Sequence, residues 1–160
     1  MIWLLLAIGL LIISGIGAMI ASTRPRVSTT IGVSGTMLGG LFGIIPAIQV
    51  LSGHALASLR LPWSVPYGSF YVHLDGLSAF FLIPMLGVPA LAALYGSRYL
   101  SVSDGRRRLG THWFFFNLLT ACMALVLIAR NGVLFLMAWE VMSLASFFLV
   151  TFDDEKESVR

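Results

Sequence analysis

The chain has 160 residues, of which 58% are hydrophobic before its 16 glycines are counted and only 11% are charged. A soluble domain carries about a quarter charged residues, and a disordered chain needs a polar, charge-rich composition. Because a chain of this length exposes much of its surface, these proportions exclude both classes. They predict a protein of the lipid bilayer, where an apolar exterior is normal.

Five long stretches of the chain carry no Asp, Glu, Lys or Arg, apart from Glu140 in the last of them. A bilayer core about 30 Å thick requires about 20 helical residues to cross it. We therefore predict an all-α membrane protein with one transmembrane domain over residues 1–152 and a charged tail over residues 153–160. The five predicted helices cover residues 2–22, 31–51, 75–97, 112–129 and 132–151.

The arginines that follow the first helix bear on its retention and on the orientation of the chain. A secretory signal would carry cations before its apolar stretch, whereas Arg24 and Arg26 follow it, so we interpret the first helix as retained. Lys and Arg collect in short cytoplasmic loops. We therefore expect the N-terminus outside and the tail in the cytoplasm. The loops after helices one and three hold Arg24, Arg26, Arg98, Arg106, Arg107 and Arg108, and those after helices two and four hold Arg60 and Arg130.

Glycine recurs at steps of three and four residues, with one adjacent pair, through the second predicted helix. Small residues at this spacing let another transmembrane helix approach closely, and we favour this packing role over ligand binding. The glycines are Gly32, Gly35, Gly39, Gly40 and Gly43.

The loop over residues 61–74 carries a turn-forming sequence between short aromatic and β-branched runs. Its centre is Pro66, Tyr67, Gly68 and Ser69. These residue types favour a tight turn, so we predict a short β-hairpin between the second and third helices.

Groups able to carry chemistry are few. The single Cys122 lacks a cysteine partner, and the three histidines show no metal-ligand spacing, so we expect no metal, redox centre or other cofactor. Phosphate-binding, dinucleotide-binding and serine-nucleophile motifs are also missing from the sequence. His112 begins the fourth predicted helix beside the basic loop, where it could deliver protons because imidazole titrates near neutral pH. A plain interfacial role for His112 is the simpler interpretation.

Glu140 lies near the middle of the fifth predicted helix. An ionised side chain at that depth costs about 2.5 to 3.5 kcal/mol on insertion scales. Protonation, contact with water, or pairing with a cation would each offset this cost. Arg130 is ten residues back, about 15 Å along the same helix axis, so it is too far for direct contact. A cationic partner in the membrane would therefore come from other polypeptide.

Helical spacing places Leu136, Ser143, Leu144 and Phe147 on the same face as Glu140. The Ser143 hydroxyl could bond the carboxyl group directly or through water. A carboxyl group removed from water can exchange protons near neutral pH, and a nearby positive charge can return it to the anion. We favour this proton-site interpretation over a neutral glutamate that only bonds another helix.

Two runs of sequence resemble a known family. Residues 139–150 read Trp-Glu-Val-Met-Ser-Leu-Ala-Ser-Phe-Phe-Leu-Val, followed by the charged stretch 152–157, and residues 74–82 read Leu-Asp-Gly-Leu-Ser-Ala-Phe-Phe-Leu. These runs resemble the fifth-helix region and the start of the third helix of hydrogenase 4 component B. That protein is one of the antiporter-like proton-translocating subunits, which also occur in formate hydrogenlyase, respiratory complex I and multisubunit sodium/proton antiporters.

The resemblance implies a role for Glu140. It corresponds to the fifth-helix glutamate of the family, which works with a lysine in a later helix, while proton movement is coupled to electron transfer elsewhere in a complex. Family members continue beyond five helices, so we expect this chain to be the N-terminal part of such a subunit, either a fragment or one piece of a split subunit.

The leading hypothesis is therefore a partial proton-translocating subunit of a hydrogenase or complex I type oxidoreductase assembly, itself without a catalytic site. Its candidate proton-translocation residues are Glu140, Ser143 and His112. The expected partners are protons, lipid, other membrane subunits and the remainder of the antiporter-like subunit, in a bacterial or archaeal cytoplasmic membrane, and no nucleic acid. A structural scaffold subunit and a small self-assembling transporter are the alternatives.

Overall fold

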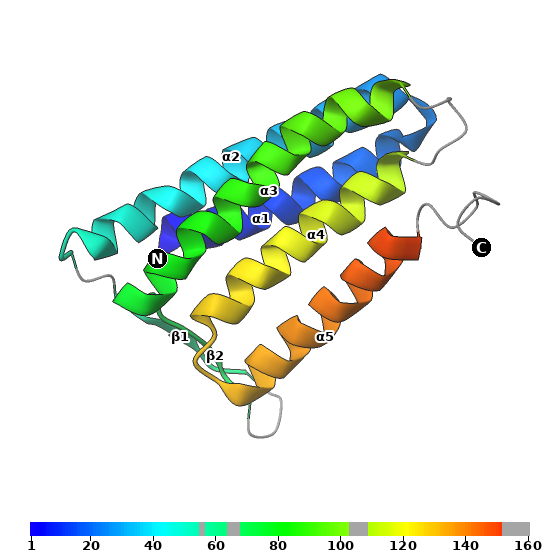
Figure 1. Ribbon diagram of the computed structural model, residues 1–160. Coiled ribbons are helices and arrows are strands. Elements are labelled where there is room, and N and C mark those ends of the chain that lie inside the picture. Colours follow the sequence, from blue (N-terminus) through cyan, green and yellow to red (C-terminus); the bar gives the residue numbers. More distant parts are fainter. Residues whose placement is uncertain (55–56, 64–67, 103–108, 152–160) are drawn as a thin grey trace.

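The computed structural model describes the chain except for residues 55–56, 64–67, 103–108 and 152–160, and the predicted charged tail falls outside the described residues. Within the described residues, five helices are long and apolar enough to cross a membrane, as predicted. The helices run up and down beside one another (Figure 1). They are α1 (Ile2–Ile20), α2 (Pro25–Leu51), α3 (Gly76–Val102), α4 (Leu109–Ile128) and α5 (Gly132–Val150), with a short 3₁₀ turn, η1 (Ala21–Thr23), between α1 and α2.

The start of α2 differs most from the prediction, which placed it at residue 31. The helix begins at Pro25, because proline suits the first helical position, where its fixed φ is already helical and no N–H is needed. The polar residues that follow are accommodated by their own hydrogen bonds. Ser28 Oγ donates to Ala18 O of α1 at 2.8 Å, and Thr30 Oγ1 donates to Arg26 O at 2.9 Å. A search for apolar residues alone does not detect residues 25–30 as helix, because this part of α2 is largely polar.

The predicted β-hairpin is confirmed between α2 and α3. Strands β1 (Leu59–Leu61) and β2 (Phe70–Val72) pair antiparallel, with Leu59 opposite Val72. The link between α4 and α5 lies along the other edge of β2, through a bridge between Val72 and Ala129. We call this end of the bundle the hairpin end, and the opposite end, which carries Arg24, Arg26 and Arg98, the arginine end.

The helices differ in how well the bundle covers them. Helix α1 packs against α2 and α4, and α3 packs against α2 and α4. Helix α5 lies at the edge and packs against α4 (Figure 1). Only Leu134, Ala138 and Ala145 of α5 are buried among the described residues. The main apolar core includes Leu4 and Leu11 of α1, Leu82 and Leu86 of α3, and Ile128 of α4.

The glycine stripe of α2 is buried and packs against three other helices, as its spacing predicts. A Cβ atom added to Gly32 would lie 2.6 Å from Trp113 of α4, and one added to Gly39 would lie 2.7 Å from Leu11 of α1. Gly43 faces Leu86 of α3. The missing side chains therefore allow these helices to approach α2 closely.

Candidate functional site

Glu140 lies on the face of α5 that points away from the bundle. The residues that α5 buries against α4, Ala138 and Ala145 among them, share one side of the helix. At about 100° per residue, Glu140 lies roughly 140° around the axis from that side. It stands eight residues after Gly132, about 12 Å along a helix of 19 residues. Its depth is therefore close to the middle of the apolar span.

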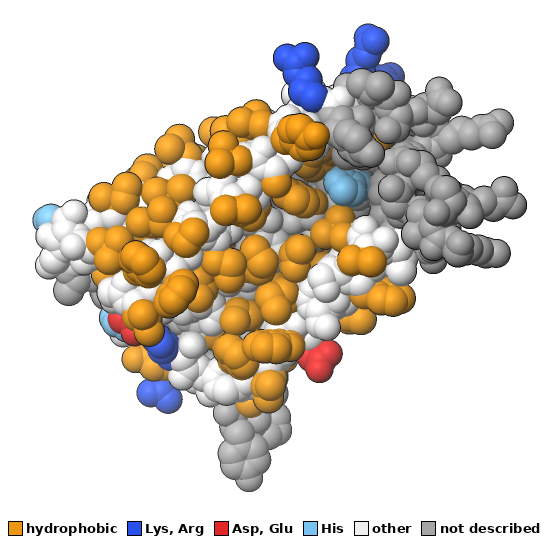
Figure 2. All heavy atoms as spheres, viewed as in Figure 1, with side chains coloured by type: hydrophobic (Ala, Val, Ile, Leu, Met, Phe, Trp, Pro, Cys, Tyr) orange, Lys and Arg blue, Asp and Glu red, His pale blue; other side chains and the backbone are white. Residues whose placement is uncertain are grey.

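The surroundings of Glu140 are apolar and uncovered by the described part of the chain. Leu136, Leu144 and Phe147, predicted to share its face, are 62%, 57% and 59% exposed. Hydrophobic side chains also cover most of the visible face of the bundle (Figure 2). The burial of Glu140 expected from its depth is therefore not found within the described residues, because α5 uses its opposite face to pack against α4.

Glu140 has no polar contact with the described residues. None of them donates a hydrogen bond to its carboxyl group or forms an ion pair with it. The neighbouring Ser143 is exposed on the same face, and no hydrogen bond between Ser143 and Glu140 is present in the described residues. The backbone carbonyl of Ser143 instead accepts a bond from Ser146 Oγ at 2.8 Å. The carboxyl group thus faces outward at a depth where only lipid or further protein could surround it.

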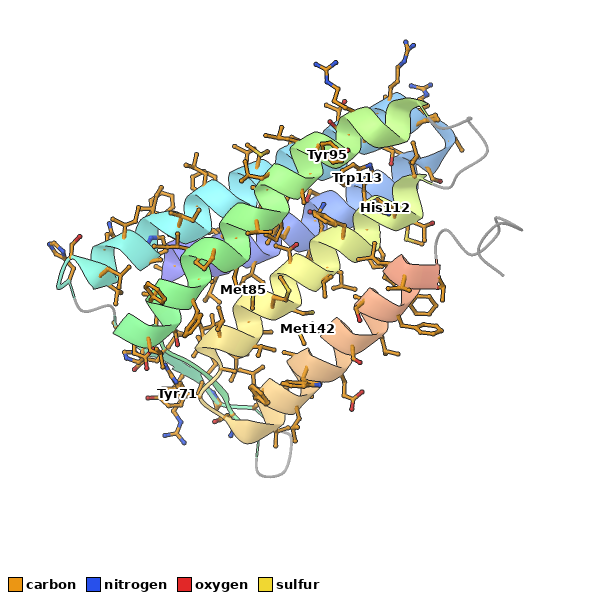
Figure 3. The ribbon with its side chains drawn as sticks, in the orientation of Figure 1. Tyr71, Met85, Tyr95, His112, Trp113 and Met142 are labelled. Carbon is orange, nitrogen blue, oxygen red and sulfur yellow. The ribbon has the colours of Figure 1, made fainter. Side chains whose placement is uncertain are left out.

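His112 lies away from Glu140, near the arginine end of α4. It is partly buried, and its ring centroid lies 5.4 Å from that of Trp113 and 6.3 Å from that of Phe116. Figure 3 places His112 near one end of the bundle and Met142, two residues from Glu140, about halfway along it. Helical rise separates His112 from the level of Glu140 by about 12 Å. The structure therefore does not bring the three predicted site residues together.

A second polar cluster lies where α1, α2 and α4 meet, and the sequence reasoning missed it. Thr36 Oγ1 lies 2.6 Å from Asn117 Oδ1, and both residues are fully buried. Asn117 Nδ2 donates to Gly32 O at 3.1 Å and to Ser14 Oγ at 3.4 Å. A lone asparagine inside an apolar helix was the available signal. Because the polar atoms bond one another across three helices, the cluster fixes helix packing.

A third cluster, also missed, lies at the hairpin end. Arg130 Nη2 lies 2.7 Å from Asp75 Oδ2 and donates to Ser78 Oγ at 3.2 Å. Asp75 Oδ1 accepts the backbone N–H of Ser78 at 2.8 Å, so Asp75 also caps the start of α3. The Ser78 hydroxyl in turn donates to Leu127 O of α4 at 2.8 Å. The sequence predicts Arg130 as a loop cation too far from Glu140 to pair with it and does not predict its contact with Asp75.

These contacts change the acidity of Asp75, which lies just outside α3. The hydrogen bonds from Ser78 and, to a smaller extent, the Arg130 guanidinium lower the pKa of Asp75 below its ordinary value of 3.8, although partial burial opposes them. Asp75 is therefore ionised near neutral pH. The described residues contain no group of three or more His, Cys, Asp or Glu side chains that could hold a metal ion.

Bacterial membrane subunits share sequence with the chain. It is 27% identical over 124 residues to hydrogenase-4 component B of Escherichia coli strain K12, covering 78% of this chain and 18% of the relative. It is 33% identical over 99 residues to Na(+)/H(+) antiporter subunit A1 of Staphylococcus haemolyticus strain JCSC1435, covering 61% and 12%. The same subunit of Staphylococcus aureus strain JH9 is 31% identical over 109 residues, covering 68% and 13%. No protein-family model matches the chain.

A solved structure shares the fold. It is the membrane-bound sulfane sulfur reductase (MBS), an archaeal respiratory membrane complex, with which the chain aligns at a TM-score of 0.69 and 23% identity. The alignment covers 90% of this chain and 22% of the other. The chain thus spans less than a quarter of the length of each of these four proteins.

Proposed function

We propose that this chain, which belongs to the antiporter-like membrane subunit family and matches one segment of its members, takes part in proton translocation within a membrane complex. Glu140 is the proposed proton-binding group. The single observation that carries the proposal is the position of this carboxyl group, which stands near the middle of an apolar span without a polar partner among the described residues. A carboxyl group that only stabilised this chain would be bonded within it.

The proposed partner of Glu140 is a cation on a neighbouring membrane segment or subunit. The five arginines of the described residues lie near the helix ends or in the connecting segments, and Arg130 is already paired with Asp75. A helix packed on the outward face of α5 would cover Leu136, Leu144 and Phe147 and bury Glu140. Burial favours the neutral carboxyl group and a nearby cation favours the anion, so a movement of that cation would drive protons on and off.

Ser143 and His112 take supporting roles in this proposal. Ser143 is three residues from Glu140 on the same exposed face, so its hydroxyl can hold a water molecule that carries the proton. His112 is partly buried near the arginine end, where it can pass protons toward the level of Glu140 through water and neighbouring subunits. In the proposed orientation the arginine end faces the cytoplasm of a bacterium or archaeon, and electron transfer elsewhere in the complex drives the movement.

A structural scaffold is the second candidate function, favoured by the wide apolar face of α5. In that case neighbouring subunits cover α5, and Glu140 stays protonated and hydrogen-bonded. The two candidates agree on assembly and differ on proton movement.

The test replaces Glu140 in the assembled membrane complex. Glu140→Gln keeps the shape and removes the titratable group, and Glu140→Asp keeps the group on a shorter stem. We expect both variants to assemble, and we expect proton uptake by energised membrane vesicles to be lost in Glu140→Gln and partly kept in Glu140→Asp. If the Glu140→Gln complex assembles and takes up protons at the full rate, the proton-binding role is wrong and the structural scaffold is the remaining candidate function.

A further inference from the structure

We propose that Arg130 and Asp75 are positioning residues that fix the first turn of α5 and thereby the height and rotation of Glu140 in the membrane. This inference rests on the proposed function of Glu140, because it concerns how that carboxyl group is aimed. It assigns a role to an ion pair that lies about 15 Å from the level of Glu140, roughly half of the thickness of the bilayer core.

The link between α4 and α5 is held more firmly than its length suggests. It consists of Ala129, Arg130 and Asn131. The backbone N–H of Arg130 donates to Tyr71 O of β2 at 2.8 Å, and the N–H of His73 donates to Ile128 O at 2.9 Å. The link therefore runs beside β2 like a third strand. Tyr71 marks this contact at the hairpin end (Figure 3).

The first turn of α5 begins directly from this fixed link. Asn131 caps it, because the Asn131 Oδ1 atom accepts the N–H groups of Val133 at 3.1 Å and Leu134 at 3.2 Å. The side chain of the preceding residue, Arg130, is tied to α3 through Asp75 and Ser78. The direction in which α5 leaves the hairpin end is thus set by α3, α4 and β2 together.

Beyond its first turn, α5 makes few buried contacts that could hold the helix in place within the described residues. Two of the three side chains that it buries are alanines, Ala138 and Ala145, which present a smooth surface to α4. Near the arginine end, Phe148 stacks on Phe115 of α4 with ring centroids 4.7 Å apart. Glu140 lies between the hairpin end of α5 and this Phe148–Phe115 stack. Few side chains of α5 are buried between the hairpin end and Phe148, so the contacts at the hairpin end have a large share in setting where Glu140 points.

The chemistry of the pair suits a positioning role. The guanidinium group is planar and forked, so Arg130 can hold the Asp75 carboxylate and the Ser78 hydroxyl at the same time. Asp75 uses one oxygen for Arg130 and the other to cap α3. The side chains of Arg130 and Asp75 remain 31% and 44% exposed, so the ion pair adds modestly to stability. The ion pair therefore acts mainly by fixing the position of the α4–α5 link relative to α3, and less by stabilising the fold.

The test compares Arg130→Gln and Asp75→Asn in the assembled complex. Asparagine still caps α3, so Asp75→Asn removes the charge pair alone. We expect each variant to assemble and to lower the rate of proton translocation about tenfold or more, as displacement of a reacting group does. The double variant should lose no more than either single variant, because both act through one contact. Arg130→Lys should recover part of the rate. Arg26→Gln, an exposed arginine at the arginine end and away from the cluster, is the control and should keep the full rate.

A second readout follows the position of residue 140 directly. In a Cys122→Ala background, Glu140→Cys is labelled with a membrane-permeant maleimide in the assembled complex. We expect Arg130→Gln and Asp75→Asn to change the labelling rate at least about threefold, since a rotated helix alters access to residue 140. An unchanged labelling rate together with an unchanged translocation rate would overturn the positioning role. If Arg130→Gln does not assemble, Asp75→Asn decides the question alone.

The outcomes separate this inference from the proposed function. If Glu140→Gln translocates protons normally, the proposed function fails whatever the ion-pair variants do. If Glu140→Gln is inactive while Arg130→Gln and Asp75→Asn are normal in both readouts, the proposed function stands and the positioning role is wrong.

Discussion

The Arg130 guanidinium lies 2.7 Å from the Asp75 carboxylate, and the same carboxylate caps the helix that Asp75 precedes. One side chain therefore joins the start of α3 to the link between α4 and α5. The attachment of α5 depends on this junction because the helix is otherwise exposed along most of its length. Glu140, the candidate proton-binding residue, therefore lies on the helix that the rest of the bundle covers least.

This junction predicts a dependence of stability on pH. The pKa of Asp75 is lower in the folded chain than its ordinary value, so the unfolded chain binds the proton more tightly. The contribution of Asp75 to stability is complete above the unfolded pKa of about 3.8 and is lost as the pH falls through the lower folded pKa. We expect Asp75→Asn to lower the melting temperature near neutral pH by a modest amount.

The measurement is thermal unfolding of the complex in detergent, for the wild type and Asp75→Asn, from about pH 6 down to about pH 3. The difference between the two proteins should shrink toward the acid end of this range. A difference that stays constant or grows with acid would contradict the ion-pair account.

The buried cluster at Asn117 predicts a loss of stability when it is disrupted. Asn117→Leu leaves the Thr36 hydroxyl and the Gly32 carbonyl with fewer bonds, so we expect a destabilisation of roughly 1 to 2 kcal/mol. Denaturation in mixed detergent measures it. Ser146→Ala is the matched control, because its hydroxyl is exposed and bonds only within α5. Equal effects of the two substitutions would show that Asn117 does not fix helix packing.

The close approach at Gly32 predicts that an added methyl group is costly. A Cβ atom at Gly32 would meet the Trp113 ring system at 2.6 Å, and Trp113 is itself fully buried and bonded through its indole N–H to Thr29 Oγ1 at 3.2 Å. We expect Gly32→Ala to destabilise the bundle by about 1 to 3 kcal/mol. Gly9→Ala, with no atom within 4 Å of the added carbon, should leave stability unchanged or slightly raised. The same unfolding measurement compares them.

Local patterns in the sequence accounted for the fold. Uncharged stretches of the right length located the five helices, and turn residues located the hairpin, because both signals are carried by neighbouring residues. The start of α2 was placed six residues too late, since hydrophobicity does not register a helix whose first turns are polar. The described structure leaves the orientation in the membrane as a prediction.

The sequence predicts the depth of Glu140 in the membrane and does not predict whether its side chain points toward the bundle or away from it. The position of Glu140 near the middle of α5 follows from counting residues. The face that α5 turns toward α4 does not, because apolar side chains lie on both the covered and the uncovered sides of α5 and two alanines define the contact. The bonds from Asn117 to Ser14 and from Arg130 to Asp75 join residues more than 50 positions apart, so they depend on which helices become neighbours.

The most direct test of the account asks whether Glu140 changes its protonation state during turnover. Infrared difference spectra of the assembled complex, recorded with and without its driving reaction, would follow the stretch of a protonated carboxyl group, and Glu140→Gln identifies the band. We predict a carboxyl band that changes on energisation and is missing in Glu140→Gln. A Glu140 band that stays the same whether or not the complex is energised would contradict the account and identify Glu140 as a neutral structural residue.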